Sequence, residues 1–266
     1  MFRKVKTPNF RKDIYKNLEF PFNLYALLLN QYGEVRYMHY GYWEDRLELS
    51  INEAQERLAE MLYEKIPIGV SRVLDVGCGL GTTVYELLKR GYDAIGISPD
   101  AGLINYAKEK YPELIDRLHI VKFEDYDASE RFDLLFFCES AQYIKDKEKL
   151  FRRVNTLLKP GGYVLICDEF LRKPSNKASF HAISDFLNTA TVQGFEILDI
   201  ENITQKVVRT RHFFSEAWNM HGSNLKKLFA EERLTAFLKS WETQSKMFED
   251  GEIGYYTIVM KLKDSL

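Results

Sequence analysis

The residues with the clearest chemical pattern are one acid and three glycines in the stretch Val73-Leu-Asp-Val-Gly-Cys-Gly-Leu-Gly81. Asp75 lies inside a short apolar run, and Gly77, Gly79 and Gly81 follow it at every second position. A loop without Cβ atoms allows a ligand to press against the backbone. The spacing differs from the G-x-G-x-x-G of dinucleotide-binding loops, which argues against an oxidoreductase. The stretch therefore predicts a small-ligand loop, with a tight turn that binds nothing as the alternative.

Side chains that could move a proton follow two other apolar runs and occur in a late polar segment. Glu139 follows residues 133–138, and Asp168 and Glu169 follow residues 163–167. If both runs are parallel strands, these acids stand at the carboxyl ends, where open α/β sheets bind ligands. His212 is a base candidate because imidazole titrates near neutral pH. The candidate catalytic residues are therefore Glu139, Asp168, Glu169 and His212, although strand-end acids and lone histidines are often structural.

The elements that would position these groups alternate between strand and helix. This alternation predicts an α/β fold, with a parallel sheet and helices on both faces. Asp100 and Asp146 are expected to cap two of the helices. The expected strands cover residues 73–76, 94–98, 118–122, 133–138, 163–167, 195–203 and 255–262, and the expected helices cover 22–32, 50–65, 83–90, 101–110, 147–158, 175–192 and parts of 204–248.

Composition narrows the class of protein. The chain has 266 residues and a net charge of −2, so no global field would recruit nucleic acid or an anionic membrane. No apolar run approaches the roughly 18 residues that span a bilayer. Cys78, Cys138 and Cys167 show neither metal-ligand spacing nor a disulfide framework. With no signal peptide in the sequence, we expect a cytoplasmic protein without a metal.

The motif Asp75-x-Gly77-x-Gly79-x-Gly81 resembles the first motif of class I S-adenosylmethionine-dependent methyltransferases. In that family the loop passes beneath the methionine part of the cofactor, whose ammonium group meets the acid. Residues 37–44 are similar to the L-H-x-G-Y-W-E segment of small-molecule methyltransferases, including enzymes acting on sugars, amines and tocopherols. The resemblance implies a seven-stranded Rossmann-like sheet, mostly parallel with the last strand antiparallel at the edge. It also implies S-adenosylmethionine as cofactor and S-adenosylhomocysteine as product.

The resemblance assigns further cofactor contacts. Ser98 ends the second strand, where many family members carry an acid that binds the ribose, and Asp100 is an alternative for that contact. Phe123 and Glu124 resemble the adenine-binding turn of cyclopropane synthases, in which the ring stacks and the acid accepts from the purine amine; an exposed acidic turn is the alternative. The aromatic residues of segment 37–44 would fold over the cofactor or, alternatively, plug the core. The implied cofactor-binding residues are Tyr40, Trp43, Asp75, Gly77, Cys78, Gly79, Gly81, Ser98, Phe123, Glu124 and Glu139.

The acceptor side departs from the family pattern. Sugar O-methyltransferases carry E-S-x-H-H after the fourth strand, whereas Gln142 and Tyr143 stand where the two histidines would be. Neither can accept a proton near neutral pH as imidazole does. The Asn/Asp-Pro-Pro-Tyr/Phe sequence of nucleic-acid methyltransferases is also missing, so no nucleic-acid partner is expected. The expected substrate-binding residues are His39, Gln142, Tyr143, His212 and Trp218.

These observations predict methyl transfer from S-adenosylmethionine to an oxygen or nitrogen of a metabolite or natural product. One alternative is C-methylation or cyclopropane-type modification of a lipid or isoprenoid, and another is a non-enzymatic binding protein with this fold. The basic residues 1–20 could pair two copies into a homodimer or touch anionic lipid, without integral membrane association. The expected parts are an N-terminal arm and lid (1–66), a core (67–203 and 254–266) and a helical cap over the substrate pocket (204–253).

Overall fold

The computed structural model describes residues 17–175 and 180–263. The chain divides into two compact units. The helical unit contains the chain up to Glu60 together with Thr204–Glu252, and the sheet unit contains Met61–Ile203 and the chain from Ile253 onward. Most of the basic arm, and with it the predicted dimer contact, lies outside the described residues.

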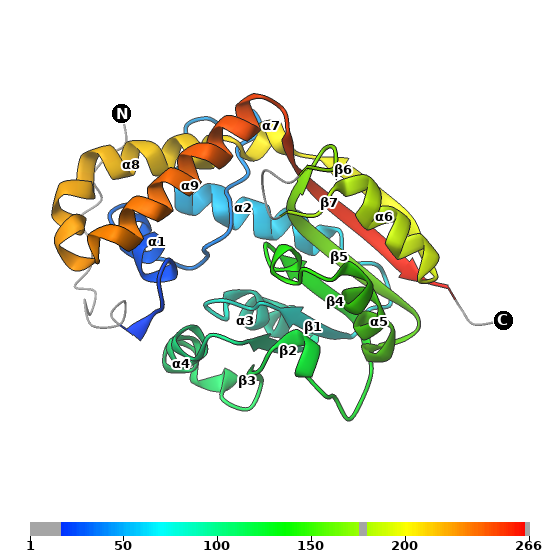
Figure 1. Cartoon of the computed structure of the whole chain (residues 1–266). Helices are drawn as coiled ribbons and strands as arrows, with labels where there is room; N and C mark the ends of the chain where they lie inside the picture. The colour runs from blue at the N-terminus through cyan, green and yellow to red at the C-terminus, as the bar shows by residue number, and fades with distance from the viewer. Residues whose placement is uncertain (1–16, 176–179, 264–266) are drawn as a thin grey trace. The chain divides into compact units, whose positions relative to one another are not determined.

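The sheet unit is built on one seven-stranded sheet with the order β3-β2-β1-β4-β5-β7-β6 (Figure 1). The first five strands are parallel, and β7 runs antiparallel to both β5 and β6. The predicted fold class is thereby confirmed. The last strand does not form the edge of the sheet, because β7 pairs on both sides and leaves β6 outermost. The strands are β1 (Arg72–Val76), β2 (Asp93–Ser98), β3 (Leu118–Ile120), β4 (Phe132–Cys138), β5 (Leu158–Leu171), β6 (Phe195–Asn202) and β7 (Ile253–Leu262).

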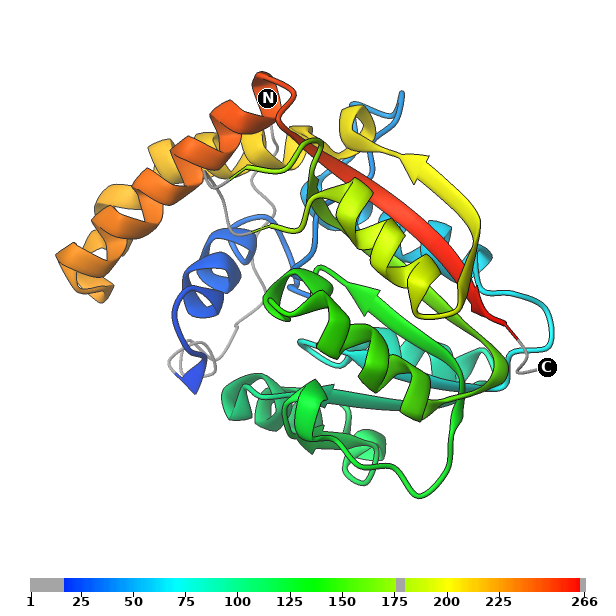
Figure 2. The same ribbon diagram turned by 45° about the vertical axis from the view of Figure 1, so that its right-hand side comes forward.

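Two helices of the sheet unit begin at a capping acid. Asp100 accepts a hydrogen bond from the Leu103 amide and starts α4, and Asp146 accepts one from the Lys149 amide and starts α5, which confirms both predicted caps. Figures 1 and 2 both show α5 and α6 side by side along the sheet. The helices of the sheet unit are α3 (Thr82–Lys89), α4 (Ala101–Lys110), α5 (Lys147–Leu157) and α6 (Ile183–Val192), with short 3-10 helices η2 (Pro112–Leu114), η3 (Phe123–Asp125) and η4 (Ala141–Tyr143).

Two elements differ most from expectation in length. Helix α6 begins at Ile183, because residues 181–182 pair with β5: the Leu171 amide donates to the His181 carbonyl, and Ala182 bridges Leu171. The predicted helix start from residue 175 falls partly on residues 176–179, which lie outside the described residues. Strand β5 runs on to Leu171 because β7 pairs with it that far. Asp168 and Glu169 therefore lie within a strand, and not beyond its end.

The central strands carry the core of the sheet unit. Leu134, Leu135, Phe136 and Phe137 of β4 are all buried, as expected for a strand covered on both faces. Apolar side chains of β1, β4, β5, α5 and α6 form one continuous cluster. This rigid sheet holds the loops at its carboxyl edge in place.

The helical unit consists of helices held together by aromatic rings. Tyr25 of α1 meets Phe214 of α8 edge to face at 5.2 Å, and Phe237 of α9 at 5.4 Å. None of the helices in residues 17–175 and 180–263 has the length and apolar composition that crossing a bilayer requires. The helices are α1 (Phe22–Leu29), α2 (Ile51–Glu64, which begins in this unit), α7 (Thr204–Val207), α8 (Arg209–Leu225), η5 (Lys226–Leu228) and α9 (Glu231–Glu249).

Candidate functional site

The glycine loop joins β1 to α3 with its backbone in the left-handed region. Gly77, Gly79 and Gly81 have φ values of +79°, +50° and +74°, which side chains with a Cβ rarely adopt. The Gly77 and Cys78 amides both donate to the Ile97 carbonyl, at 2.8 and 3.1 Å, and pin the loop to the end of β2. The loop therefore has a defined shape before any ligand binds.

The three glycines face different surroundings. A Cβ at Gly77 would lie 2.5 Å from the Cβ of Ser140, and one at Gly81 would lie 2.8 Å from the Cβ of Ala107. At Gly79 the nearest atom would be the Gly77 carbonyl oxygen, at 3.9 Å. Two of the glycines thus allow close packing within the protein, and Gly79 is the one with open space above its backbone.

Asp75 carries a buried carboxylate that lacks a partner. The residue is 3% exposed, and its Oδ2 has no hydrogen-bond partner among the described residues. Burial raises the pKa of Asp75 to about 8. A buried charge without compensation is unfavourable, so a cationic group placed there would be stabilised. This oxygen lies in the same strand and loop segment as the open position at Gly79, and it fits the ammonium group that the resemblance assigns to it.

The carboxyl end of β2 offers two more oxygens. Ser98 is buried, and its Oγ accepts a hydrogen bond from the Asp100 amide at 3.2 Å. Asp100 uses Oδ1 to cap α4, while its Oδ2 is buried and has no partner in the part of the chain that the structure describes. Both residues predicted for a ribose contact are thus available at this edge, and Asp100 holds the vacant acceptor.

The turn after β3 places its aromatic ring inward. Phe123 is buried in the core cluster and meets Phe137 edge to face at 5.5 Å. Glu124, next to it in η3, is half-buried. The stacking of Phe123 on a purine and the role of Glu124 stay predictions.

Glu139 is held at the end of β4 in an unusual conformation. It has φ +53°, and its amide donates to the Cys167 carbonyl at 2.8 Å. A residue with a Cβ pays of order 1–3 kcal/mol for such a backbone, a strain that often occurs at functional sites. Its carboxylate Oε1 accepts a 2.6 Å hydrogen bond from the hydroxyl of Tyr255.

Tyr255 is a site residue that sequence reasoning missed. It is fully buried on β7, opposite Glu169 of β5, and burial raises the pKa of its phenol well above the ordinary value, so it stays a donor. The sequence predicted a strand over residues 255–262. Nothing in the sequence indicated that its partner lies more than a hundred residues away.

Asp168 accepts hydrogen bonds from the backbone around it. It is 1% exposed and accepts hydrogen bonds from the amides of Gln142, at 3.1 Å, and Glu169, at 2.8 Å. Burial raises the pKa of Asp168 to about 7, against the lowering effect of these two amides. Asp168 therefore holds the segment after β4 against β5. On that segment Gln142 is half-buried and Tyr143 is 65% exposed.

The other predicted residues belong to the helical unit. Trp43 is buried; its amide donates to the Lys206 carbonyl at 2.8 Å and its indole to the Leu49 carbonyl at 3.3 Å. Tyr40 is also buried, and burial lowers the pKa of the neighbouring His39 to about 4, so that ring is neutral near pH 7. On α8, His212 is exposed and Trp218 is half-buried.

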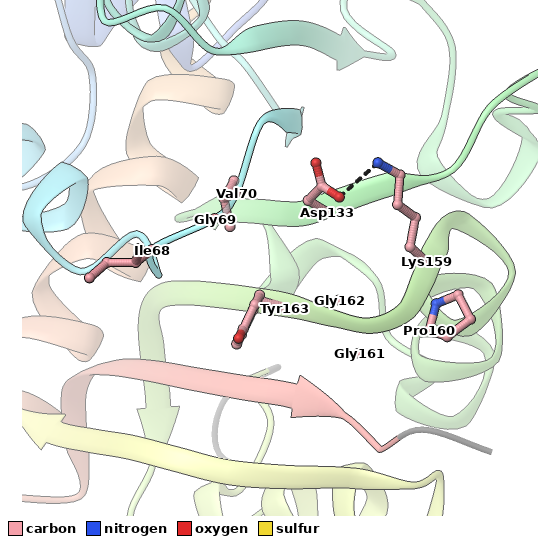
Figure 3. A pocket seen from close by; sticks show the side chains of 9 residues that line it. All are labelled: Ile68, Gly69, Val70, Asp133, Lys159, Pro160, Gly161, Gly162 and Tyr163. Atoms are coloured by element: carbon pink, nitrogen blue, oxygen red, sulfur yellow. Dashed lines mark hydrogen bonds and ion pairs between the residues drawn. The ribbon is translucent and has the colours of Figure 1, made fainter. Parts of the chain in front are cut away.

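A shallow pocket lies at the opposite, amino-terminal edge of the sheet (Figure 3). Asp133 near the start of β4 pairs with Lys159 at 2.7 Å and accepts from the amides of Ser71 and Arg72. Ligands of open α/β sheets bind at the carboxyl edge. Asp133 already pairs with these groups, so we assign it a structural role and do not treat this pocket as the functional site.

The cysteines do not form a metal cluster with other ligands. Cys138 and Cys167 are direct neighbours on β4 and β5, and burial raises the pKa of the Cys78 thiol well above its ordinary value. Within residues 17–175 and 180–263, no three His, Cys, Asp or Glu side chains converge as a metal site would require.

Comparison with protein families gives one match that covers most of the chain. The family model described as "Methyltransferase domain" matches residues 42–228. Three curated relatives align with about 60% of the chain: methyltransferase GfsG of Streptomyces halstedii (27% identical, 61% of the chain), phosphoethanolamine N-methyltransferase 3 of Arabidopsis thaliana (28%, 63%) and 27-O-demethylrifamycin SV methyltransferase of Amycolatopsis mediterranei (31%, 58%). The aligned part spans 61%, 31% and 58% of those proteins, less than two thirds of each.

Solved structures agree in fold. A putative sarcosine dimethylglycine methyltransferase from Galdieria sulphuraria superimposes with a TM-score of 0.76 at 16% identity, over 96% of this chain and all of that one. At this identity the likeness concerns the fold alone. It supports the strand order described above.

Proposed function

Because the chain belongs to the methyltransferase-domain family of class I S-adenosylmethionine-dependent enzymes, we propose that it methylates an oxygen or nitrogen atom of a small molecule. The predicted family, with S-adenosylmethionine as its cofactor, is confirmed. The identity of the acceptor atom is the part that we propose. Among the relatives, one is named for methylation at oxygen and another for methylation at nitrogen.

The observation that carries the proposal is the buried carboxylate of Asp75, whose Oδ2 has no partner among the described residues, together with the open backbone of Gly79 four residues further along the chain. The methionine part of the cofactor ends in an ammonium group, which would pair with Oδ2 and favour the ionised acid. Asp100 Oδ2 would accept from a ribose hydroxyl. The bound cofactor supplies a methyl group already activated on a sulfonium, so the protein has to align an acceptor with it and exclude water.

Glu139 is the residue that we propose for the acceptor side. Its carboxylate is oriented by Tyr255, which donates to Oε1, and the residue is half-buried at the carboxyl edge. A carboxylate held in this way can accept a hydrogen bond from an acceptor hydroxyl or amine and take its proton as the methyl group is transferred. Asp168 is less suited, because both of its oxygens accept from backbone amides.

The test is a transfer assay with methyl-labelled S-adenosylmethionine. Two panels of acceptors, phenols and other hydroxyl compounds in one and primary and secondary amines in the other, are assayed for labelled product. We expect product from one panel. Glu139→Gln should lower kcat about 100- to 10,000-fold, the range typical of a general base. Glu196→Gln, an exposed acid on β6, is the control and should match the wild type.

Two results would contradict the proposal. One is binding of S-adenosylmethionine without transfer to any member of either panel. The other is an equal rate for Glu139→Gln and the wild type on an acceptor that is methylated, which would remove Glu139 from the chemistry.

A further inference from the structure

A buried hydroxyl beside the glycine loop has no partner. Ser140 is 8% exposed, and its Oγ forms no hydrogen bond with any described residue. It stands at the N-cap position of η4, yet its side chain accepts no hydrogen bond from that helix. Burial of a hydroxyl without a partner is unfavourable, and alanine would fill the same place without this cost. The hydroxyl is therefore unexplained by the fold.

Ser140 lies directly against the glycine loop. A Cβ built on Gly77 would come within 2.5 Å of the Ser140 Cβ and 3.2 Å of its Oγ. Gly77 itself is exposed. The hydroxyl thus borders the exposed backbone of Gly77, and rotation about χ1 moves it between the three staggered positions of a serine side chain.

Asp75 presents the other unpartnered oxygen in this neighbourhood. Strands β1 and β4 are parallel neighbours, with Val76 opposite Phe137, so Asp75 and Ser140 come from adjacent strands that end at the same edge of the sheet. Both side chains are more than nine-tenths buried, and both have an oxygen without a partner. A ligand group with several donors would satisfy both.

We propose that Ser140 binds the amino-acid part of S-adenosylmethionine together with Asp75. The ammonium group has three N–H donors, and the carboxylate beside it is an acceptor. A serine hydroxyl can accept from the first or donate to the second, and its small size fits the contact with Gly77. This inference rests on the proposed function and adds a residue to that site.

Calorimetric titration with two probes separates this role from a structural one. S-adenosylhomocysteine contains the amino-acid part, and 5′-methylthioadenosine lacks it but keeps the adenosine and the sulfur. For Ser140→Ala we expect the Kd for S-adenosylhomocysteine to rise about five- to tenfold, the usual effect of one hydrogen bond, and the Kd for methylthioadenosine to stay unchanged. The ligand-free variant should melt at the wild-type temperature or above it, because the change removes an unpartnered hydroxyl.

Asp100→Asn is the contrasting variant, because the ribose contact that we propose for Asp100 Oδ2 is common to both probes and both Kd values should rise. The assignment of Ser140 is overturned if Ser140→Ala binds S-adenosylhomocysteine as tightly as the wild type. It is also overturned if both probes weaken equally, as a distorted loop would cause. A wild type that binds neither probe overturns the proposed function, and this assignment with it.

Discussion

Replacement of Asp75 by asparagine should stabilise the ligand-free protein and weaken cofactor binding. In the folded sheet unit burial raises the pKa of Asp75 from 3.8 to about 8, whereas the unfolded chain releases that proton near pH 4. Asparagine has nearly the same shape and no charge to bury. The variant therefore removes the pH-dependent loss in the free energy of unfolding that ionisation of the buried Asp75 causes in the ligand-free wild type.

The size of the effect follows from proton linkage. Between about pH 4 and about pH 8 the folded wild type holds a proton on Asp75 that the unfolded chain has lost, so its free energy of unfolding falls as the pH rises. One pH unit corresponds to about 1.4 kcal/mol, so the full window allows at most about 6 kcal/mol. The advantage of Asp75→Asn should grow steadily with pH up to about 8 and then level off.

Urea unfolding of the ligand-free proteins, repeated from about pH 5 to about pH 9, measures this difference. Asp116→Asn, an exposed acid, is the control and should differ from the wild type by less than about 0.5 kcal/mol at every pH. Calorimetry on the same samples should show S-adenosylhomocysteine binding to Asp75→Asn at least about 30-fold more weakly, since loss of one partner of a buried charge pair costs about 2–5 kcal/mol. A difference in stability that does not change with pH would refute the reasoning.

Three other outcomes are expected from the same site. The affinity of the wild type for S-adenosylhomocysteine should rise by up to about tenfold per pH unit below pH 8, because Asp75 must release its proton to pair with an ammonium group, and a flat calorimetric profile would contradict this. Gly79→Ala should fold, with a loss of about 1–3 kcal/mol in the free energy of unfolding because of its positive φ, yet fail to bind S-adenosylhomocysteine. Gly77→Ala should be the less stable of the two in thermal melts, because its Cβ would lie 2.5 Å from the Cβ of Ser140. Tyr255→Phe removes the donor of a 2.6 Å hydrogen bond to a carboxylate and should lower the free energy of unfolding by about 1.5–3 kcal/mol, while the neighbouring Tyr256→Phe should cost less than about 1 kcal/mol; equal losses in urea titrations would argue against a special role.

The sequence predicted the sheet well because its signals are local. The signals are the glycine motif, the capping acids Asp100 and Asp146, and the apolar run of β4. Each depends only on residues that are a few positions apart in the sequence. The prediction placed the last strand at the edge of the sheet and was wrong, because β7 lies between β5 and β6. Strand order depends on pairing between distant segments, which local patterns do not report. The predicted start of α6 was wrong for a similar reason. Ala182 pairs with Leu171 of β5, and this contact overrides the helical periodicity of the sequence.

The candidate site was predictable only in part. Asp75 and Gly79 could be named because they belong to one short motif. Gly77 and Gly81 also have a packing role that the motif did not predict, because their missing Cβ atoms make room for Ser140 and Ala107 from other parts of the chain. Contacts of this kind bring together residues far apart in sequence, and local patterns carry no signal for them.

A crystal structure of the protein with S-adenosylhomocysteine would show whether Asp75 binds the ligand. We expect the ammonium nitrogen within hydrogen-bond distance, about 2.7–3.2 Å, of Asp75 Oδ2, with the ligand lying against the backbone of Gly79. A ligand bound elsewhere, with the Asp75 carboxylate still lacking a partner, would contradict this expectation.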